Sequence, residues 1–306
     1  MPLPPTLENR PDPQFKLVFL DSGAHSLWNI YVGKMGNKAG YAYYDSPEFY
    51  AYCDRYASFV KAYPKSIDFY ANIDVIYDPE RSWKVLKYLE NEHGLDKSKL
   101  VPVIHYGAGP EWVDRHLEAG YQYLGIGGLG QGVTKNMYLD WGDALFTQLC
   151  PASNDYLPLV RTHGFAMTAI ELMWRYPWFS VDSSTWTKVG AYGNIFVAKK
   201  VDGQFYFHHE LKEKRPYMMC FSNESKIGDE ASKHYNRGLS KGEKGELLEW
   251  LDEIEVPLGD DNTEGITNSH SCRKLANLLF FERVRKSLPK YPWAYTPRDK
   301  ERSRVI

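Results

Sequence analysis

The seven residues Asp68-Phe69-Tyr70-Ala71-Asn72-Ile73-Asp74 carry the pattern that decides the fold. A short, mostly apolar run ends there in a polar residue, as a buried strand does. The next segment opens at Pro79 and ends at Gly94, with apolar residues at helical spacing between them. A strand followed by a helix is the building unit of a parallel sheet. We therefore predict an α/β fold.

The same unit recurs over the first two thirds of the chain. Five further apolar runs end in polar or glycine-rich turns, namely Lys16–Leu20, Leu100–Tyr106, Tyr121–Ile126, Leu159–Thr162 and Trp178–Val181. A chain of 306 residues is long enough for one barrel of about 250 residues with insertions. We expect one main core over residues 16–290, folded as a modified TIM-like (β/α)8 barrel.

The rhythm changes after Trp186. Asp202-Gly203 suits a tight turn between two strands, which predicts a β-hairpin insertion over about residues 190–215. Helical patterns follow at residues 246–253 and 268–288. We expect the last of these C-terminal helices to bury Leu275, Leu278 and Leu279.

Charge, apolar runs and cysteine spacing limit the kinds of partner and compartment that we expect for this protein. Lys plus Arg number 37 and Asp plus Glu 39, so the net charge of −2 supplies no global positive field, and a nucleic acid would need a local basic patch. No apolar run approaches the roughly 20 residues of a membrane span. The four cysteines form no CxxC pair, and the start of the chain lacks a secretory pattern, which favours a cytoplasmic protein. We expect an extended N-terminal arm over residues 1–15 and a basic tail over residues 291–306.

Three of the strand runs end in an aspartate: Asp21, Asp74 and Asp182. The carboxyl ends of barrel strands form the face on which active sites are built. Two carboxylates in one pocket suit chemistry at a sugar anomeric carbon, where one attacks to form a covalent intermediate and the other handles protons. The structural alternative is that each aspartate caps the helix that follows it.

Glycines and histidines also lie near the strand ends. Gly125-Ile126-Gly127-Gly128-Leu129-Gly130 matches GxGxxG, yet no helical pattern opens directly after it, so a dinucleotide site is not favoured. The glycines would let a flat ligand approach the backbone, and a purely structural turn fits them equally well. His25, His105 and His163 lack the spacing of a zinc site, and we expect them to stack and to form hydrogen bonds.

Together these motifs resemble the tRNA-guanine transglycosylase superfamily, and most closely the viral DpdA-type enzymes that insert 7-deazaguanine bases into DNA. The match runs from Leu17 to Trp186, with the motifs in the family's order. It rests on Asp21-Ser22-Gly23-Ala24-His25-Ser26, Asp68–Asp74, Gly127-Gly128-Leu129, His163–Met167 and Phe179–Asp182. The resemblance implies base exchange on a DNA guanine. This chain has only 15 residues before Lys16, whereas the tRNA enzymes have further strands there.

The resemblance also implies roles for individual residues. Asp182 would attack C1′ of the nucleotide, Asp21 would manage protons, and Asp74 would accept hydrogen bonds from the base. His25 stands where the family has a stacking aromatic residue. The full set of implied base-binding positions is Asp74, Ser22, His25, His105, Tyr106, Gly127, Gly128, Leu129 and His163.

Base exchange requires a flipped or single-stranded nucleotide and no ATP or redox cofactor. The expected partners are DNA, with tRNA as the alternative, and a free 7-deazaguanine base. Basic residues near the hairpin are candidates for holding the backbone, with a solvated charged surface as the alternative. They are Lys199, Lys200, Lys212, Lys214 and Arg215.

The tRNA enzymes hold a structural zinc with three closely spaced cysteines and a later histidine. His270 and Cys272 resemble at most a remnant of that site, so we predict no metal, and the missing cysteines favour DNA over tRNA. Two other functions remain open. A base-excising N-glycosidase would use the same carboxylates with water as the acceptor, and a non-catalytic nucleic-acid-binding protein would not need them.

Overall fold

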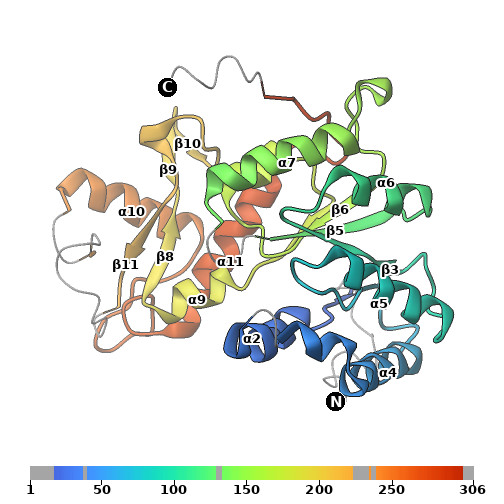
Figure 1. Ribbon diagram of the computed structural model, residues 1–306. Helices are drawn as coiled ribbons and strands as arrows, with labels where there is room; N and C mark the ends of the chain where they lie inside the picture. The colour runs from blue at the N-terminus through green and yellow to red at the C-terminus, as the bar shows by residue number, and fades with distance from the viewer. Residues whose placement is uncertain (1–16, 37–39, 129–132, 223–233, 236–238, 299–306) are drawn as a thin grey trace. The chain divides into compact units, whose positions relative to one another are not determined.

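The computed structural model describes residues 17–36, 40–128, 133–222, 234–235 and 239–298 (Figure 1). It has a mixed α/β structure with parallel sheets. The chain divides into two compact units. The first comprises Met1–Phe165, Trp178–Ser180 and Ala294–Ile306, and the second comprises Ala166–Pro177 and Val181–Trp293. The expected N-terminal arm, residues 1–15, lies outside the described residues.

The first unit is built on parallel strands that follow one another in chain order. These strands are β1 (Phe19–Leu20), β2 (Phe69–Ala71), β3 (Leu100–Val101), β4 (Val103–His105), β5 (Tyr123–Gly127), β6 (Arg161–Gly164) and β7 (Ser180–Val181). One sheet has the order β1-β2-β3 and the other the order β4-β5-β6-β7. Each of the six predicted runs contains a strand, so the α/β prediction is confirmed. The last residue of β7, Val181, belongs to the second unit.

Pro102 separates β3 from β4 because proline has no N–H to donate. Its carbonyl still accepts a hydrogen bond from the Gly125 N–H at 2.8 Å. On one side Leu100 pairs with Tyr70 of β2, and on the other Val103 pairs with Gly125 of β5. Residues 100–105 therefore form one extended segment that joins the two parallel sheets.

Helices alternate with these strands, as the sequence predicts. They are α2 (Ala24–Met35), α4 (Pro47–Ala62), α5 (Pro79–Asn91), α6 (Pro110–Glu118), α7 (Lys135–Leu149) and two short 3-10 helices, η1 (Ala42–Asp45) and η2 (Ala152–Asn154). Ser46 caps α4 by accepting the Phe49 N–H, and Asp78 caps α5 by accepting the Arg81 N–H. The proline in the first turn of each of these two helices lacks only an N–H that would have no partner.

Aromatic side chains from distant strands share the interior of the first unit. The ring of Phe19 in β1 stacks on His163 in β6, with centroids 4.6 Å apart. Phe69 in β2 meets Tyr123 in β5 edge to face at 5.0 Å. The guanidinium of Arg161 lies within 5.2 Å of the Tyr123 ring centroid. Strands of the two sheets thus contribute side chains to one aromatic core.

His116 in α6 makes the stability of the first unit sensitive to acid. Its ring is 5% exposed, and its Nδ1 donates to the Trp112 carbonyl oxygen at 2.5 Å. Burial lowers the pKa of His116 to about 4. The folded state therefore holds this imidazole neutral, whereas an unfolded histidine titrates near pH 6.5.

We expect the free energy of unfolding to fall as the pH drops from about 6.5 to about 4, because the unfolded chain binds the proton first. The largest loss from His116 is about 3 kcal/mol, reached when the pH is below the folded pKa. Urea unfolding at several pH values measures this, and the His116→Phe variant should lose that part of the slope. Equal slopes in the two proteins would contradict the assignment.

The second unit combines antiparallel strands with four α-helices and one 3-10 helix among its described residues. Its elements are β8 (Asn194–Val197), β9 (Lys199–Val201), β10 (Gln204–Tyr206), β11 (Tyr217–Cys220), α8 (Ile170–Arg175), α9 (Thr185–Ala191), η3 (Lys212–Lys214), α10 (Lys241–Glu253) and α11 (His270–Ser287). β9 and β10 form the predicted hairpin, with positive φ at Asp202 and Gly203 in its turn. β8 pairs with β11. Trp250 and Phe280 anchor the core of this unit.

The buried face of α11 differs from the prediction. Leu275 and Leu278 are each 47% exposed, and Leu279 is partly buried. The buried residues of the helix are Arg273, Ala276, Asn277, Phe280 and Val284. Two polar residues are buried because they bond to backbone groups that would otherwise lack partners: Asn277 Oδ1 accepts the Phe196 N–H at 2.8 Å. The prediction is therefore wrong for Leu275 and Leu278, whereas Leu279 packs against the core.

Part of the expected basic tail packs onto the first unit. Tyr295 is 2% exposed, and its N–H donates to the Tyr156 carbonyl oxygen at 2.9 Å. Arg298 Nε lies 3.0 Å from a carboxylate oxygen of Asp143. Residues 299–306 lie outside the described residues. No described helix combines the length and apolar character needed to span a bilayer.

Candidate functional site

Asp74 and His105 meet at the carboxyl ends of the strands in the first unit. Asp74 comes three residues after β2, and His105 is the last residue of β4. The Asp74 carboxylate accepts a hydrogen bond from His105 Nε2, with side-chain exposures of 7% and 13%. Burial and then the negative charge of Asp74 raise the pKa of Tyr44, which keeps its phenol protonated. The structure thus brings together two residues that the sequence placed in one site.

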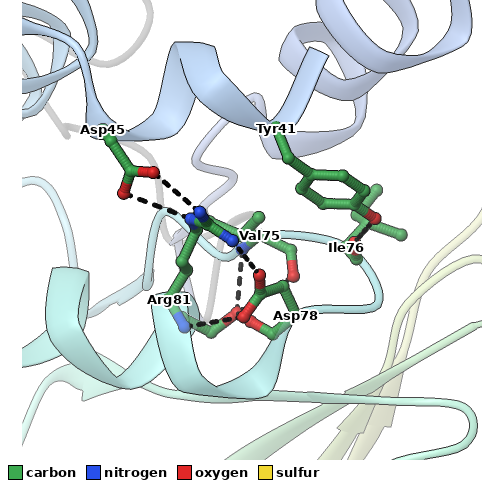
Figure 2. A network of polar contacts seen from close by, with 7 residues as sticks. Tyr41, Asp45, Val75, Ile76, Asp78 and Arg81 are labelled. Atoms are coloured by element: carbon green, nitrogen blue, oxygen red, sulfur yellow. Dashed lines mark hydrogen bonds and ion pairs between the residues drawn. The ribbon is translucent and has the colours of Figure 1, made fainter. Parts of the chain in front are cut away.

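The loop that carries Asp74 is held by several hydrogen bonds (Figure 2). Ser82 Oγ accepts the Val75 N–H at 2.8 Å, and Tyr41 donates its hydroxyl to the Ile76 carbonyl oxygen at 2.7 Å. The Asn72 side chain donates to the Ser82 carbonyl oxygen at 2.9 Å. Bonds on both sides of Asp74 restrict its backbone, which lets the carboxylate serve as a fixed acceptor.

Arg81 fastens the base of the same loop, as Figure 2 shows. It forms a two-pronged pair with Asp45, with N–O distances of 3.2 and 2.7 Å, and it contacts Asp78 at 2.5 Å. The Arg81 hydrogen bond lowers the pKa of Asp45. Planar two-pronged pairs fix direction as well as distance. Helix α5 is therefore locked to η1, and the Asp74 loop lies between these elements in the chain.

A pocket of about 500 Å³ lies beside His105, and Asp74 is not among the residues that line it. His105 and Tyr106 form part of its wall, together with Tyr77, which lies two residues before α5. Tyr77 has a φ of 63°, a left-handed backbone conformation that a large side chain rarely adopts. Strained backbone of this kind persists only where its surroundings hold it in place, and it concentrates at ligand-binding sites. The remaining wall residues are Pro79, Ser82, Val103, Gly107, Ala108 and Val133.

The predicted glycine segment packs against the same strand end. A Cβ atom on Gly127 would come within 3.0 Å of the His105 ring, and one on Gly128 within 2.4 Å of Tyr106 Cβ. Gly128 also has a φ of 122°, which side chains other than hydrogen rarely allow. These two glycines are therefore needed to seat His105 and Tyr106, which supports the structural interpretation of the segment. Leu129 lies outside the described residues.

The motif after β1 contributes one buried and two exposed residues. Ser22 is 2% exposed, and its carbonyl oxygen accepts the Tyr52 hydroxyl at 2.6 Å. Asp21 is exposed and accepts the Gly23 N–H at 3.4 Å. His25 is exposed on α2, and its Nδ1 lies 3.3 Å from the Asn29 amide nitrogen. Burial and then Asp21 raise the pKa of Tyr52.

His163 lies inside the first unit, on β6. Its ring is 5% exposed, stacked on Phe19 and edge to face with Phe165 at 4.5 Å. His163 Nδ1 is 2.7 Å from Ser180 Oγ, and Ser180 Oγ is 2.5 Å from the Tyr123 hydroxyl. The sequence identified His163 as a candidate but not Ser180 or Tyr123. Ser180 lies two residues before Asp182, and that spacing is the one signal that could have pointed to it.

Asp182 belongs to the second unit, whereas Asp21 and Asp74 belong to the first. It is exposed, and its Oδ1 accepts the Ala166 N–H at 2.9 Å. Its carbonyl oxygen accepts the Met167 N–H at 2.9 Å. None of the three aspartates provides the N-cap of a described helix: α2 starts after Gly23, α5 after Asp78 and α9 after Ser184. The helix-cap interpretation is wrong for all three.

The basic candidates lie in the second unit, around the hairpin. Lys200 pairs with Glu249 at 2.7 Å, and Lys199 donates to the Glu213 carbonyl oxygen at 3.2 Å. Arg215 donates to the His209 carbonyl oxygen. Lys212 and Lys214 are the two ends of η3. Because the Lys200 ammonium group already pairs with a carboxylate, Lys200 is a weaker candidate for phosphate binding than the other four.

The expected zinc remnant is engaged in other contacts. His270 Nδ1 lies 3.0 Å from an Arg273 nitrogen, and Cys272 is a partly buried free thiol. Within the described ranges, no group of three or more His, Cys, Asp or Glu side chains is placed to hold a metal ion.

Comparison with known proteins identifies no relative of this chain. No protein-family model matches the chain, and neither does any curated protein or solved structure. The residues and contacts described above are therefore the basis for assigning a function.

Proposed function

We propose that this protein is a DNA guanine transglycosylase, which exchanges guanine for a 7-deazaguanine base. One observation carries the proposal: at the carboxyl ends of parallel strands the buried Asp74 pairs with His105, which lines a pocket of about 500 Å³. Pockets of about 300–1,000 Å³ hold small organic ligands. The carboxyl ends of parallel strands are where α/β proteins bind them.

The chemistry of the pocket suits a guanine-like base. The edge of guanine that carries its amino group presents two neighbouring N–H donors, and an ionised carboxylate is an acceptor with two oxygens. Asp74 adjoins the pocket through His105, which lines it, and the second oxygen of Asp74 is the acceptor that the proposal assigns to the base. Tyr77 and Tyr106 supply aromatic faces, on which any base can stack. The fixed loop around Asp74 keeps the acceptor in place.

The proposal assigns the bond changes to Asp182 and Asp21. A carboxylate oxygen of Asp182 forms a bond to C1′ as the bond from C1′ to guanine N9 breaks, and guanine leaves with a proton. The incoming base gives up its N9 proton and attacks C1′, which releases the Asp182 carboxylate. Asp21 supplies the first proton and takes up the second. Two displacements retain the configuration at C1′, and no oxidant or ATP enters the balance.

A TIM-like barrel is the fold that we propose for the catalytic core. Its support is the chain-order sequence of parallel strands and the contact between Phe19 in β1 and His163 in β6, which belong to different sheets. In such a barrel each strand neighbours the next along the chain, and the interior is filled with side chains. The chain-order strands of the first unit match the first feature, and its aromatic interior matches the second.

Incorporation of a labelled base tests the activity. Purified protein is incubated with guanine-containing single-stranded DNA and labelled free guanine, and the DNA is then digested to nucleosides and analysed by mass. We expect label in deoxyguanosine without loss of bases, and the same assay with 7-deazaguanine bases should yield a modified nucleoside. Release of guanine without incorporation would instead indicate an N-glycosidase. No change in DNA would contradict the proposal.

A parallel reaction with tRNA shows whether DNA or tRNA is the preferred substrate. The proposal predicts incorporation into DNA in preference to tRNA at equal guanine concentration. Preferential incorporation into tRNA would support base exchange as the activity but contradict DNA as the substrate.

A further inference from the structure

One imidazole nitrogen holds the turn that follows β10 in the second unit. His208 Nδ1 accepts the N–H groups of His209 and Glu210, at 2.9 and 3.2 Å. A backbone N–H can only donate, so Nδ1 is the acceptor in both bonds and carries no proton. The single ring proton of the neutral imidazole is therefore on Nε2. One side chain thus supplies the acceptor for two consecutive backbone groups.

Ring contacts hold the His208 imidazole beside these N–H groups. The side chain is 20% exposed. Its ring centroid lies 4.1 Å from that of Trp174 in α8, and the ring stacks on His209 at 4.6 Å. The Tyr206 ring lies 6.2 Å away. Trp174 is itself tied to the same strand end, because its Nε1 donates to the Phe207 carbonyl oxygen at 3.1 Å.

The turn is connected by hydrogen bonds to residues 212–215, which include three of the basic candidates. The Leu211 N–H donates to the Tyr206 hydroxyl at 3.0 Å. The Arg215 side chain donates to the His209 carbonyl oxygen. The conformation of the turn therefore determines where the backbone that carries these basic side chains lies.

We propose that His208 is a pH-sensitive switch for the segment 209–215, which is closed while Nδ1 is unprotonated and opens when Nδ1 takes up a proton. A proton on Nδ1 removes the acceptor and places a third donor beside the two backbone N–H groups. These groups then lack a partner, and opening of the turn lets them bond to water. The inference goes beyond the proposed function and does not depend on it.

The charges around the two stacked histidines determine the pH at which the segment opens. Burial lowers the pKa of His208, and Glu210, whose carboxylate lies 3.9 Å from Nε2, opposes this effect. Burial and then His208 lower the pKa of His209. Glu171 of α8 raises that pKa, whereas Arg215 lowers it. Because a released histidine titrates near pH 6.5, the closed form loses stability as the pH falls below about 6.5.

Hydrogen exchange in the full-length protein tests the switch. The amide protons of His209 and Glu210 are followed at about pH 7.5 and about pH 5, on either side of the usual histidine pKa, and each rate is divided by the intrinsic rate at that pH. We expect the protection of both amides to fall about tenfold at the lower pH, the size of one or two lost hydrogen bonds. Equal protection at the two pH values would overturn the proposal.

Two matched variants identify the group that titrates. His208→Asn should keep the protection seen at neutral pH and lose its pH dependence, because the asparagine oxygen accepts N–H groups of the residues that follow and does not titrate. His209→Asn should keep the pH dependence, since His208 is unchanged. A pH response that persists in His208→Asn, or that disappears in His209→Asn, would refute the role of His208.

Long-range ¹H–¹⁵N spectra of the unmodified protein, labelled at histidine, give a readout that needs no variant. We expect His208 Nδ1 to be unprotonated at neutral pH and to gain its proton over the pH range in which the amide protection is lost. If His208→Asn fails to fold, the agreement of these two ranges decides the outcome. A protonated Nδ1 at neutral pH, or protonation without loss of protection, would contradict the switch.

Discussion

Replacing Asp182 with asparagine is expected to lower the rate of base exchange by at least about a thousandfold, because an amide cannot attack C1′ as a carboxylate does. Asparagine has nearly the same size, and its side-chain oxygen can still accept the Ala166 N–H that Asp182 accepts at 2.9 Å. The fold should therefore survive while the chemistry is lost. Steady-state incorporation of labelled guanine into DNA measures the effect.

Asp252→Asn is the matched control, since Asp252 is an exposed aspartate of α10 in the same unit. We expect it to keep the exchange rate within twofold, because an exposed carboxylate with no assigned role in the reaction contributes little. Equal rates in the Asp182→Asn variant and the unmodified protein would remove Asp182 from the mechanism and favour a non-catalytic role.

Replacing Arg273 with methionine should destabilise the second unit by about 3–5 kcal/mol. Arg273 is 2% exposed in α11. It donates to the Gly190 carbonyl oxygen at 2.9 Å and to the Ile266 carbonyl oxygen at 2.7 Å. These bonds connect α11 to α9 and to the loop that precedes α11. Methionine fills much of the volume but leaves both buried carbonyls without this donor, and each such group costs about 1–3 kcal/mol.

Urea unfolding followed by tryptophan fluorescence measures this loss, because Trp250 lies in the same core. Arg283→Met on the same helix is the control. Arg283 is 39% exposed and pairs with Glu253 at 2.9 Å, so its loss should cost less than about 1 kcal/mol. Equal losses in the two variants would show that the buried hydrogen bonds of Arg273 do not stabilise the unit.

The strands of the first unit could be predicted because their signal is local. A run such as Asp68–Ile73 is apolar over the length of a strand and ends in a polar residue, and each of the six runs contains a strand. The helix at Pro47–Ala62 has an equally local signal, because Phe49, Cys53, Tyr56 and Val60 repeat at helical spacing and are buried.

Elements without such a local signal were missed or misjudged. Helix α2 begins after Gly23, which makes no side-chain cap, so its start lacked the usual marker. On α11 the apolar Leu275 and Leu278 are exposed, whereas Arg273 and Asn277 are buried. Their burial depends on backbone partners in α9 and β8, which residue spacing does not reveal.

The candidate site shows the same limit. That Asp74 and His105 both lie near strand ends could be read from the sequence, but their hydrogen bond depends on how the β3–β4 segment sits beside β2. The contact between Ser180 and His163 likewise depends on the neighbouring positions of β6 and β7. Arg81 was not predicted because its two acidic partners lie 36 and 3 residues away, and only the folded loop brings them together.

Mapping a covalent adduct tests the mechanism most directly. The protein is mixed with a guanine-containing DNA strand, quenched under denaturing conditions, digested with nuclease and protease, and the peptides are analysed by mass. We predict a deoxyribose ester on the peptide at Asp182, which the Asp182→Asn variant lacks and which free guanine in excess discharges. Base exchange with no adduct at Asp182, or with an adduct on another carboxylate, would contradict the account.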